Sequence, residues 1–239
     1  MGSEMCIRDR NIYSAFLQNE WKNDRWGILI GGRLDKHNMV DNVIFSPRAN
    51  LRFNPTQNIN LRLSYSSGFR APQAFDEDMH IENVGGTVAM IERAKDLKEE
   101  KSQSFSASAD MYHRFGAFQT NLLIEGFYTR LTDVFVLGKP YDRGDGILVK
   151  TRSNGPGAKV MGLTLEGKVA YLSILQIQAG LTLQRSRYDE PHKWHDDAPA
   201  EKKIFRTPDT YGYFTATCTP IKPLSLSLIH ISEPTRPLY

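Results

Sequence analysis

The chain has 239 residues, a formal net charge of +3 and a mean hydropathy of -0.43. A charge balance so near neutral predicts no special attraction to nucleic acid. No apolar run approaches the ~18 residues of a transmembrane helix, so a helical membrane span is excluded from this sequence.

Both ends of the chain resemble translated sequencing adapter. Residues 1–10 (MGSEMCIRDR) match a transposon-type adapter, and residues 226–236 (LSLIHISEPTR) match the same adapter on the opposite strand. We therefore expect residues 1–10 and about 226–239 to be non-native and take residues 11–225 as the protein. Cys6 then belongs to the adapter, and Cys218 alone can form neither a disulfide framework nor a metal site.

Period-two alternation of apolar and polar residues is the dominant pattern, and it predicts about ten strands. In chain order these are roughly 11–21, 26–35, 44–54, 58–66, 102–114, 117–137, 147–172, 174–188 and 204–218, with a tenth beginning at 223. Alternation indicates a strand whose two faces meet different solvents. Several strands reach the ~9 to 11 residues that cross a bilayer, which indicates membrane strands.

The connections alternate between short and long. Tight turns are expected at 22–25, 55–57, 115–116, 172–173 and 220–222, and long polar segments at 36–43, 67–101, 138–146 and 189–203. This order is typical of an up-and-down outer-membrane barrel, whose periplasmic turns are short and whose extracellular loops are long. Trp21 and Trp26 flank the first tight turn, where a periplasmic aromatic girdle would lie; alternatively, they only pack on each other. Polar residues such as Arg62, Glu166 and Gln178 would face a wet lumen.

The stretch Gly68, Phe69, Arg70, Ala71 and Pro72, followed by an acidic segment, resembles the "GFRAP" element in the barrel of TonB-dependent outer-membrane receptors. Three later stretches are also similar to this family in order and spacing: Glu125–Tyr128 with Asp133–Phe135, Asn154–Glu166, and Phe205–Pro208. Gly68 permits backbone conformations closed to other residues, and we expect Phe69 to anchor at the outer interface and Pro72 to end strand pairing. Arg70 would point inward or into the lipid headgroups.

The resemblance implies an all-β fold: an antiparallel up-and-down transmembrane β-barrel fragment, about ten strands of a roughly 22-stranded barrel. It also implies a non-enzymatic receptor in the outer membrane of a Gram-negative bacterium that takes up a scarce nutrient, of the iron-siderophore, haem or cobalamin class. The implied partners are outer-membrane lipid, a small-molecule or metal-chelate ligand, and the TonB complex, contacted through a plug region missing here. No cofactor is expected.

The expected outer loop 67–101 is long enough to be functional or disordered. Phe75, Asp76, Glu77, Asp78 and His80 gather an aromatic, three acids and a histidine, which favours a ligand-contacting loop; a solvated loop, or ion-pair partners for the plug, is the alternative. Residues 92–101 are rich in helix formers and suggest a short surface helix. Gly155–Gly157 would be a bulge or kink inside strand 147–172.

His192, His195, Asp196 and Asp197 have a spacing that can bind a metal, although such clusters in polar loops are usually only solvated. No catalytic motif is present in the sequence. Two alternatives from other classes are a small outer-membrane barrel enzyme, which predicts natural termini near residues 11 and 225, and a soluble β-rich binding module, which needs an apolar interior between facing sheets.

Overall fold

The computed structural model describes residues 11–38, 40, 42–72, 89–142, 144, 148–192, 200–204, 207–221 and 224–232. These residues form strands and turns. No helix among them is long and apolar enough to cross a membrane.

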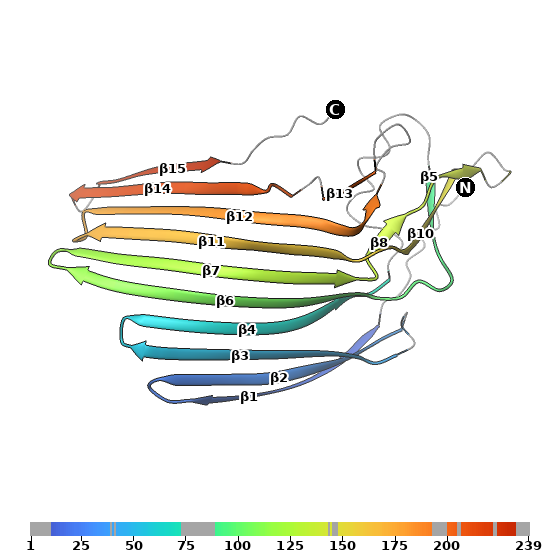
Figure 1. Cartoon of the computed structure of the whole chain (residues 1–239), viewed down its shortest axis with the longest axis horizontal. Coiled ribbons are helices and arrows are strands. Elements are labelled where there is room, and N and C mark those ends of the chain that lie inside the picture. Colours follow the sequence, from blue (N-terminus) through green and yellow to red (C-terminus); the bar gives the residue numbers. More distant parts are fainter. Residues whose placement is uncertain are drawn as a thin grey trace.

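One large antiparallel sheet contains most of the described chain (Figure 1). Its strands follow the order of the sequence: β1 (Ile12–Lys22), β2 (Trp26–His37), β3 (Ile44–Thr56), β4 (Ile59–Arg70), β6 (Glu100–Phe115), β7 (Phe118–Thr132), β11 (Ala158–Tyr171), β12 (Leu175–His192), β14 (Thr210–Ile221) and β15 (Leu224–Ser232). The short β13 (Glu201–Lys203) adds to β12. Within the described part of the chain, β1 and β15 each pair on one side only, so the sheet is open.

The prediction of ten antiparallel strands is confirmed, and so is the order of connections. Figure 1 shows the tight turns together at one end of the sheet and the long connections at the other. The first turn is fixed locally, because Asn23 Oδ1 accepts hydrogen bonds from the backbone N–H groups of Arg25 (2.9 Å) and Trp26 (2.7 Å). We call the side with the long connections the outer end, since long loops of outer-membrane barrels are extracellular.

A second, smaller sheet lies at the outer end (Figure 1). It consists of β5 (Ala89–Arg93), β8 (Phe135–Leu137), β9 (Tyr141–Asp142) and β10 (Leu148–Asn154). The pair β5–β10 is parallel, and the other two pairs are antiparallel. We call these four strands the external subsheet. The sequence pattern did not predict it.

The external subsheet corrects two predicted strands. The expected strand 117–137 breaks at Asp133, whose φ of 56° is left-handed, so β7 ends at Thr132 and β8 turns away. The expected strand 147–172 breaks at 155–157, where Pro156 has no N–H for a ladder; β10 and β11 therefore belong to different sheets. The expected bulge within one strand is wrong.

Three smaller boundaries also differ from the predictions. The strand expected at 58–66 continues to Arg70, because Ser67 to Arg70 pair with β6. The strand expected at 204–218 begins only at Thr210, after Pro208. The helix expected over 92–101 is wrong: its residues end β5, form a turn at 95–96 and begin β6.

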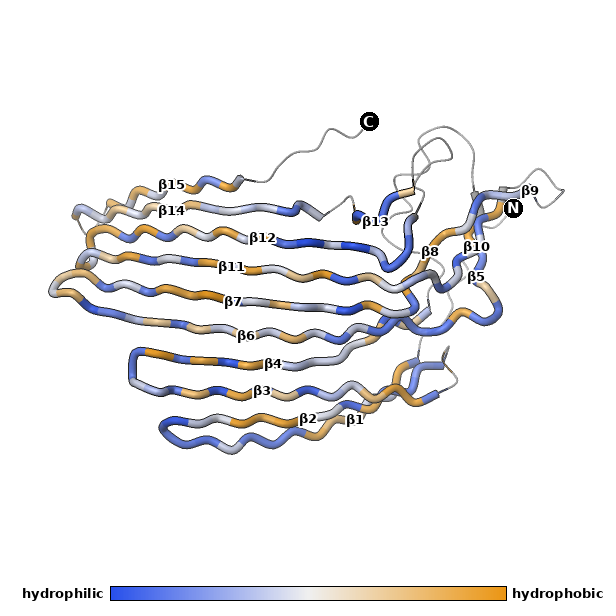
Figure 2. The backbone as a smooth tube through the Cα atoms, viewed as in Figure 1, coloured by the Kyte–Doolittle hydropathy of each residue, from blue (hydrophilic) through white to orange (hydrophobic). Residues whose placement is uncertain are grey.

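The register sorts the side chains of the main sheet onto two different faces. Paired residues of neighbouring strands point to the same side. Leu163 pairs with Leu183 and Leu165 with Leu181, and all four side chains are 44–48% exposed. We call this side the apolar face. The intervening residues, such as Thr164 and Thr182, lie on the polar face, and Figure 2 shows the resulting alternation along the strands.

The sheet has almost no core. Among the described residues the buried apolar side chains are Val40, Ile44, Val149 and Ala158, whereas large apolar side chains of the main strands are exposed. No second sheet covers either face of the described main sheet. A soluble module with an apolar interior between facing sheets does not fit this arrangement. The arrangement fits a sheet that has lipid on one face and water on the other.

Two rows of aromatic side chains bound the apolar face. Near the tight turns, Trp26 stacks on Phe53 with ring centroids 4.3 Å apart. This contact differs from the alternative in which the two tryptophans pack on each other. The same row holds Phe115 and Phe118 of β6 and β7, which are paired in the register.

Near the outer end, Tyr65 contacts Phe105 with ring centroids 4.7 Å apart, and Phe105 pairs with Tyr128. Along β7, Tyr128 is ten residues from Phe118 of the first row. Ten residues span ~34 Å along a strand, or ~25 Å across the membrane at a tilt of ~40°, which is the height of an outer-membrane apolar band.

The last strand breaks the alternation. Leu226 and Leu228 of β15 pair with β14 on the apolar face, but Ile229 and Ile231 pair with Thr215 and Tyr213 on the polar face. Ile229 is 66% and Ile231 is 70% exposed. Most of this strand consists of the adapter-like residues. Their Leu and Ile side chains favour a strand, and the edge of β14 is a template for pairing.

Candidate functional site: the polar wall and the external subsheet

Cross-strand hydrogen bonds cover the polar face. The side-chain pairs are Asn50–Ser64 (2.8 Å), Ser104–Thr129 (2.9 Å), Asp110–Asn121, Thr164–Thr182 (3.1 Å) and Gln178–Tyr213 (2.7 Å). Hydroxyl and amide groups of this kind hold neighbouring strands together and remain able to bond water. This face is therefore a polar wall that suits an aqueous lumen, as the alternation predicted.

The polar wall has a hollow near the outer end of β1 to β4. Its volume is about 510 Å³, and its lining includes Phe16, Arg33, Asp35, Arg48 and Gly68. Arg33 holds the buried Asp35 carboxylate through Nε (2.8 Å) and Nη2 (2.7 Å). The hollow therefore combines a fixed ion pair with a further cation, and Arg48 can meet an anionic group there.

The motif from Gly68 to Pro72 lies where β4 meets the outer end. Gly68 has no positive φ and therefore does not use the left-handed conformations that a glycine permits; a Cβ there would lie 3.1 Å from Ser102 Oγ on the paired strand. Phe69 pairs with Lys101 on the apolar side. Pro72 is buried just beyond the end of β4, as expected for a residue that stops strand pairing.

Arg70 joins the main sheet to the external subsheet. Its guanidinium carbon lies 5.0 Å from the ring centroid of Phe135 on β8, a cation–π distance. Glu100, the strand partner of Arg70, accepts a hydrogen bond from the Phe135 N–H at 3.0 Å. The expected inward direction of Arg70 agrees with this contact, which explains why an arginine and an aromatic side chain suit these positions.

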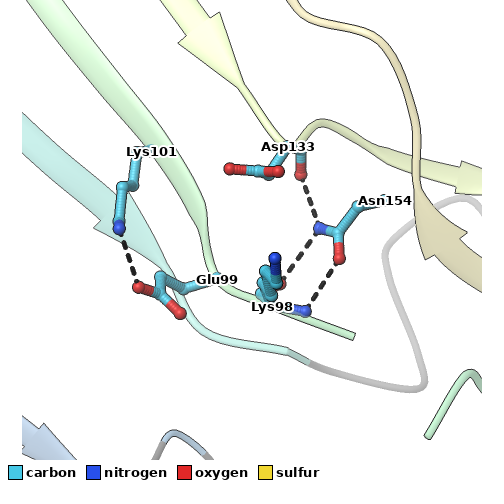
Figure 3. A network of polar contacts seen from close by, with 5 residues as sticks. All are labelled: Lys98, Glu99, Lys101, Asp133 and Asn154. Atoms are coloured by element: carbon cyan, nitrogen blue, oxygen red, sulfur yellow. Dashed lines mark hydrogen bonds and ion pairs between the residues drawn. The ribbon is translucent and has the colours of Figure 1, made fainter. Parts of the chain in front are cut away.

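Asn154 is the second link between the two sheets (Figure 3). Its Nδ2 donates to the backbone carbonyls of Asp133 (2.8 Å) and Lys98 (3.1 Å), and its Oδ1 accepts from the Lys98 N–H (2.8 Å). One side chain thus ties together the end of β10, the approach to β6 and the break after β7. The sequence pattern placed Asn154 in a family-like stretch but did not show this role.

Replacing Asn154 with Ala is expected to loosen the external subsheet while the main sheet stays intact. Three hydrogen bonds are lost, each contributing ~1 kcal/mol, so local opening should increase at least about tenfold. Hydrogen exchange of the full-length protein measures this at the Ala94 and Gly138 amides, which bond to Arg152 and Thr151 of β10. Asn154→Asp keeps the acceptor for the Lys98 N–H but replaces the donor with an anionic oxygen facing two carbonyl groups, so it should open the external subsheet as well. Unchanged exchange in both variants would contradict this role.

The predicted ligand-contacting residues Phe75, Asp76, Glu77, Asp78 and His80 lie outside the described residues. The strands on either side of their segment are placed: β4 ends at Arg70 and β5 begins at Ala89, both at the outer end (Figure 1).

Of the metal candidates, His192 ends β12 and pairs with Glu201 of β13, while His195, Asp196 and Asp197 lie outside the described part of the chain. Within the described part there is no group of three or more His, Cys, Asp or Glu side chains that could hold a metal ion. Both sets of site residues remain predictions.

The main sheet is a wall segment of an outer-membrane β-barrel. It has a lipid-facing and a water-facing side, tight turns at one end, and long connections with the external subsheet at the other. The sequence matches the family described as "TonB dependent receptor-like, beta-barrel" over residues 6–218. The chain belongs to this family, whose members are transporters of the Gram-negative outer membrane and not enzymes. The alternative of a small barrel enzyme is therefore wrong.

Solved structures of this class are similar in fold. The siderophore receptor PirA from Pseudomonas aeruginosa has a TM-score of 0.68 and 16% identity; the match covers 92% of this chain and 39% of that one. The FrpB iron transporter from Neisseria meningitidis (F3-3 variant) has a TM-score of 0.64 and 16% identity; the match covers 91% of this chain and 32% of that one. The copper transporter OprC has a TM-score of 0.57 and 14% identity; the match covers 87% of this chain and 32% of that one. The chain spans about a third of these proteins. No curated protein matches it.

Proposed function

We propose that the complete protein takes up a scarce, chelated nutrient across the outer membrane, energised by the TonB complex. Membership in the receptor family carries this proposal. Among the iron-siderophore, haem and cobalamin classes, the iron-siderophore class has the most support, because similar structures include a siderophore receptor and an iron transporter. The similarity to a copper transporter makes a copper species the second candidate cargo.

In this proposal the ligand meets the outer end of the barrel. Phe75 with the acids Asp76, Glu77 and Asp78 and with His80 would contact it from the segment between β4 and β5. The polar wall would line the path below, where Arg33 and Arg48 beside the hollow suit the negative charge of a ferric chelate. TonB would be contacted through a plug region, which the matched barrel residues do not include.

The first step of the test is to sequence native genomic DNA outward from codons 60–210. We propose that residues 1–10 and about 226–239 are adapter-derived, so the natural frame should diverge from them. The natural residues after Ser225 should keep apolar side chains on the face that holds Leu224, without the switch seen at Ile229. A genome that encodes LSLIHISEPTR would contradict the adapter proposal.

The complete gene is then expressed in a Gram-negative host that lacks its own siderophore receptors. Uptake of radioactive iron is measured with a panel of siderophores, and uptake of haem, cobalamin and copper is measured in parallel. We expect one iron-siderophore to be taken up well above the empty-vector background, and uptake to fall to background when tonB is deleted. Uptake that persists without tonB would contradict the proposal, and copper uptake alone would identify the second candidate.

A further inference from the structure

A row of cationic side chains crosses the apolar face at its outer end. In the register Arg130 of β7 pairs with Lys159 of β11, and Lys159 pairs with Arg187 of β12. Paired residues point to the same side, so the three cations form one row across three strands, ~10 Å wide. Arg185 lies two residues from Arg187 on the same face, next to Met161. We call Arg130, Lys159, Arg185 and Arg187 the cationic row.

Arg130, Lys159 and Arg187 lie just outside the apolar band, and Arg185 lies level with the outer aromatic row, because its partner Met161 pairs with Tyr128. Arg130 is two residues beyond Tyr128, which belongs to the outer aromatic row. Two residues of a strand tilted by ~40° raise the side chain ~5 Å above that aromatic row. Aromatic girdles mark the membrane interface, so this height is that of lipid headgroups and not of acyl chains.

The cationic row carries more positive charge than the protein neutralises. Asp189 is the acidic residue that contacts the cationic row: Lys159 Nζ lies 2.8 Å from its Oδ1, and Arg130 Nη2 lies 3.8 Å from its Oδ2. Four cations against one carboxylate leave a net charge of +3. Neither Arg185 nor Arg187 has a side-chain hydrogen bond or ion pair with the described part of the chain. The side chains of Arg130 and Lys159 are 50% and 38% exposed.

The position of these cations needs an explanation, because β4 and β6, on the side of Arg130, have none at this height; on the other side Lys203 of β13 pairs with Arg187 but forms an ion pair with Asp209. At the same level β4 and β6 carry Ser67 and Gln103. Below the cationic row the face is aliphatic, with Leu163 and Leu183 paired and exposed. A lipid with anionic groups at headgroup height fits both parts, since its phosphates would meet the cations and its acyl chains would lie on the leucines.

We propose that the cationic row binds the phosphate groups of a phosphorylated glycolipid in the outer leaflet of the outer membrane. Asp189 holds Arg130 and Lys159 in place and reduces their charge, while Arg185 and Arg187 are available to the lipid. The site lies on the side opposite to the polar wall, so it is separate from the path proposed for the nutrient.

The test uses the complete receptor, purified in a zwitterionic detergent and titrated with bisphosphorylated lipid A under native mass spectrometry. In the variant R130Q/K159Q/R187Q, affinity should fall by on the order of 100-fold, since each cation at an anionic membrane surface contributes about a fivefold factor. Dephosphorylated lipid A should bind weakly to the native receptor and to this variant alike.

The matched control is R62Q/R114Q/K168Q, which removes the same charge from the polar face; its affinity for lipid A should be unchanged. Equal losses in both triple variants would overturn the proposal, because bulk charge would then explain binding. Unchanged affinity of the cationic-row variant would overturn it as well. Heat-dependent gel migration verifies that each variant forms a barrel.

The variant D189N separates direct electrostatics from any folding defect, because a damaged barrel cannot gain affinity. Removing this carboxylate should tighten lipid A binding about fivefold, the factor expected for one charge. No gain would contradict a direct contact between the cations and phosphate. Inorganic phosphate distinguishes the two sources of the anion: failure of excess phosphate to displace lipid A supports a lipid site, and complete displacement would overturn it in favour of a soluble anion.

Discussion

Expressed alone, the 239-residue chain is expected to aggregate or to be recovered only in inclusion bodies. Its main sheet is open, and every residue of the edge strands β1 and β15 is exposed. Unpaired strand edges are templates for pairing with other chains. The apolar face adds exposed side chains such as Leu17 (82%) and Trp21 (54%) to the aggregating surface.

Size-exclusion chromatography and thermal melting of the chain, refolded with and without detergent, measure this outcome. The complete receptor, refolded in the same detergent, is the control and should give a monomer, because a closed barrel has no free edges. A soluble, detergent-free monomer of the 239-residue chain that melts cooperatively would show that these strands form a self-sufficient fold, which the open sheet does not predict.

In the complete receptor, Leu165→Arg is expected to destabilise the barrel by ~2–4 kcal/mol. Leu165 lies on the apolar face and pairs with Ile124 near the middle of the apolar band. A guanidinium at that depth is taken out of water without a partner, and its cost is greatest at the membrane midplane. Reversible folding into phospholipid vesicles, followed by tryptophan fluorescence over a denaturant series, measures the free energy of unfolding.

Thr164→Arg is the matched control, since it introduces the same side chain one residue away. Thr164 lies on the polar face and bonds to Thr182. The control should lose that hydrogen bond only, at a cost of ~1 kcal/mol, because its charge can remain in water. Similar losses for both variants would contradict the assignment of the lipid-facing side.

The sequence by itself determined the membrane class of this protein. Alternation is a local property, because neighbouring residues of any strand point to opposite sides. The alternation therefore predicts that a residue such as Leu163 faces lipid, without any knowledge of the partner strand. The alternation of short and long connections is equally readable along the chain, and it gave both the antiparallel order and the outer end. The family resemblance rested on the same features and on the stretch from Gly68 to Pro72.

The tertiary structure decided everything that depends on register and on contacts between distant segments. Asp133 and Pro156 do not by themselves predict that their strands change sheets. That change depends on the pairing of β10 with β5 and with β8, which are distant or separate segments of the sequence. The links of Asn154 to Lys98 and of Arg70 to Phe135 join residues far apart in sequence.

The cationic row depends on register in the same way. Arg130, Lys159 and Arg187 look like scattered surface charges in the sequence, and they become one row only when β7, β11 and β12 are paired. Alternation assigns each residue a face, but it cannot assign a height, because sliding one strand by two residues keeps every side chain on its face. The fixed pairing across the whole sheet sets that height, and with it the outer site.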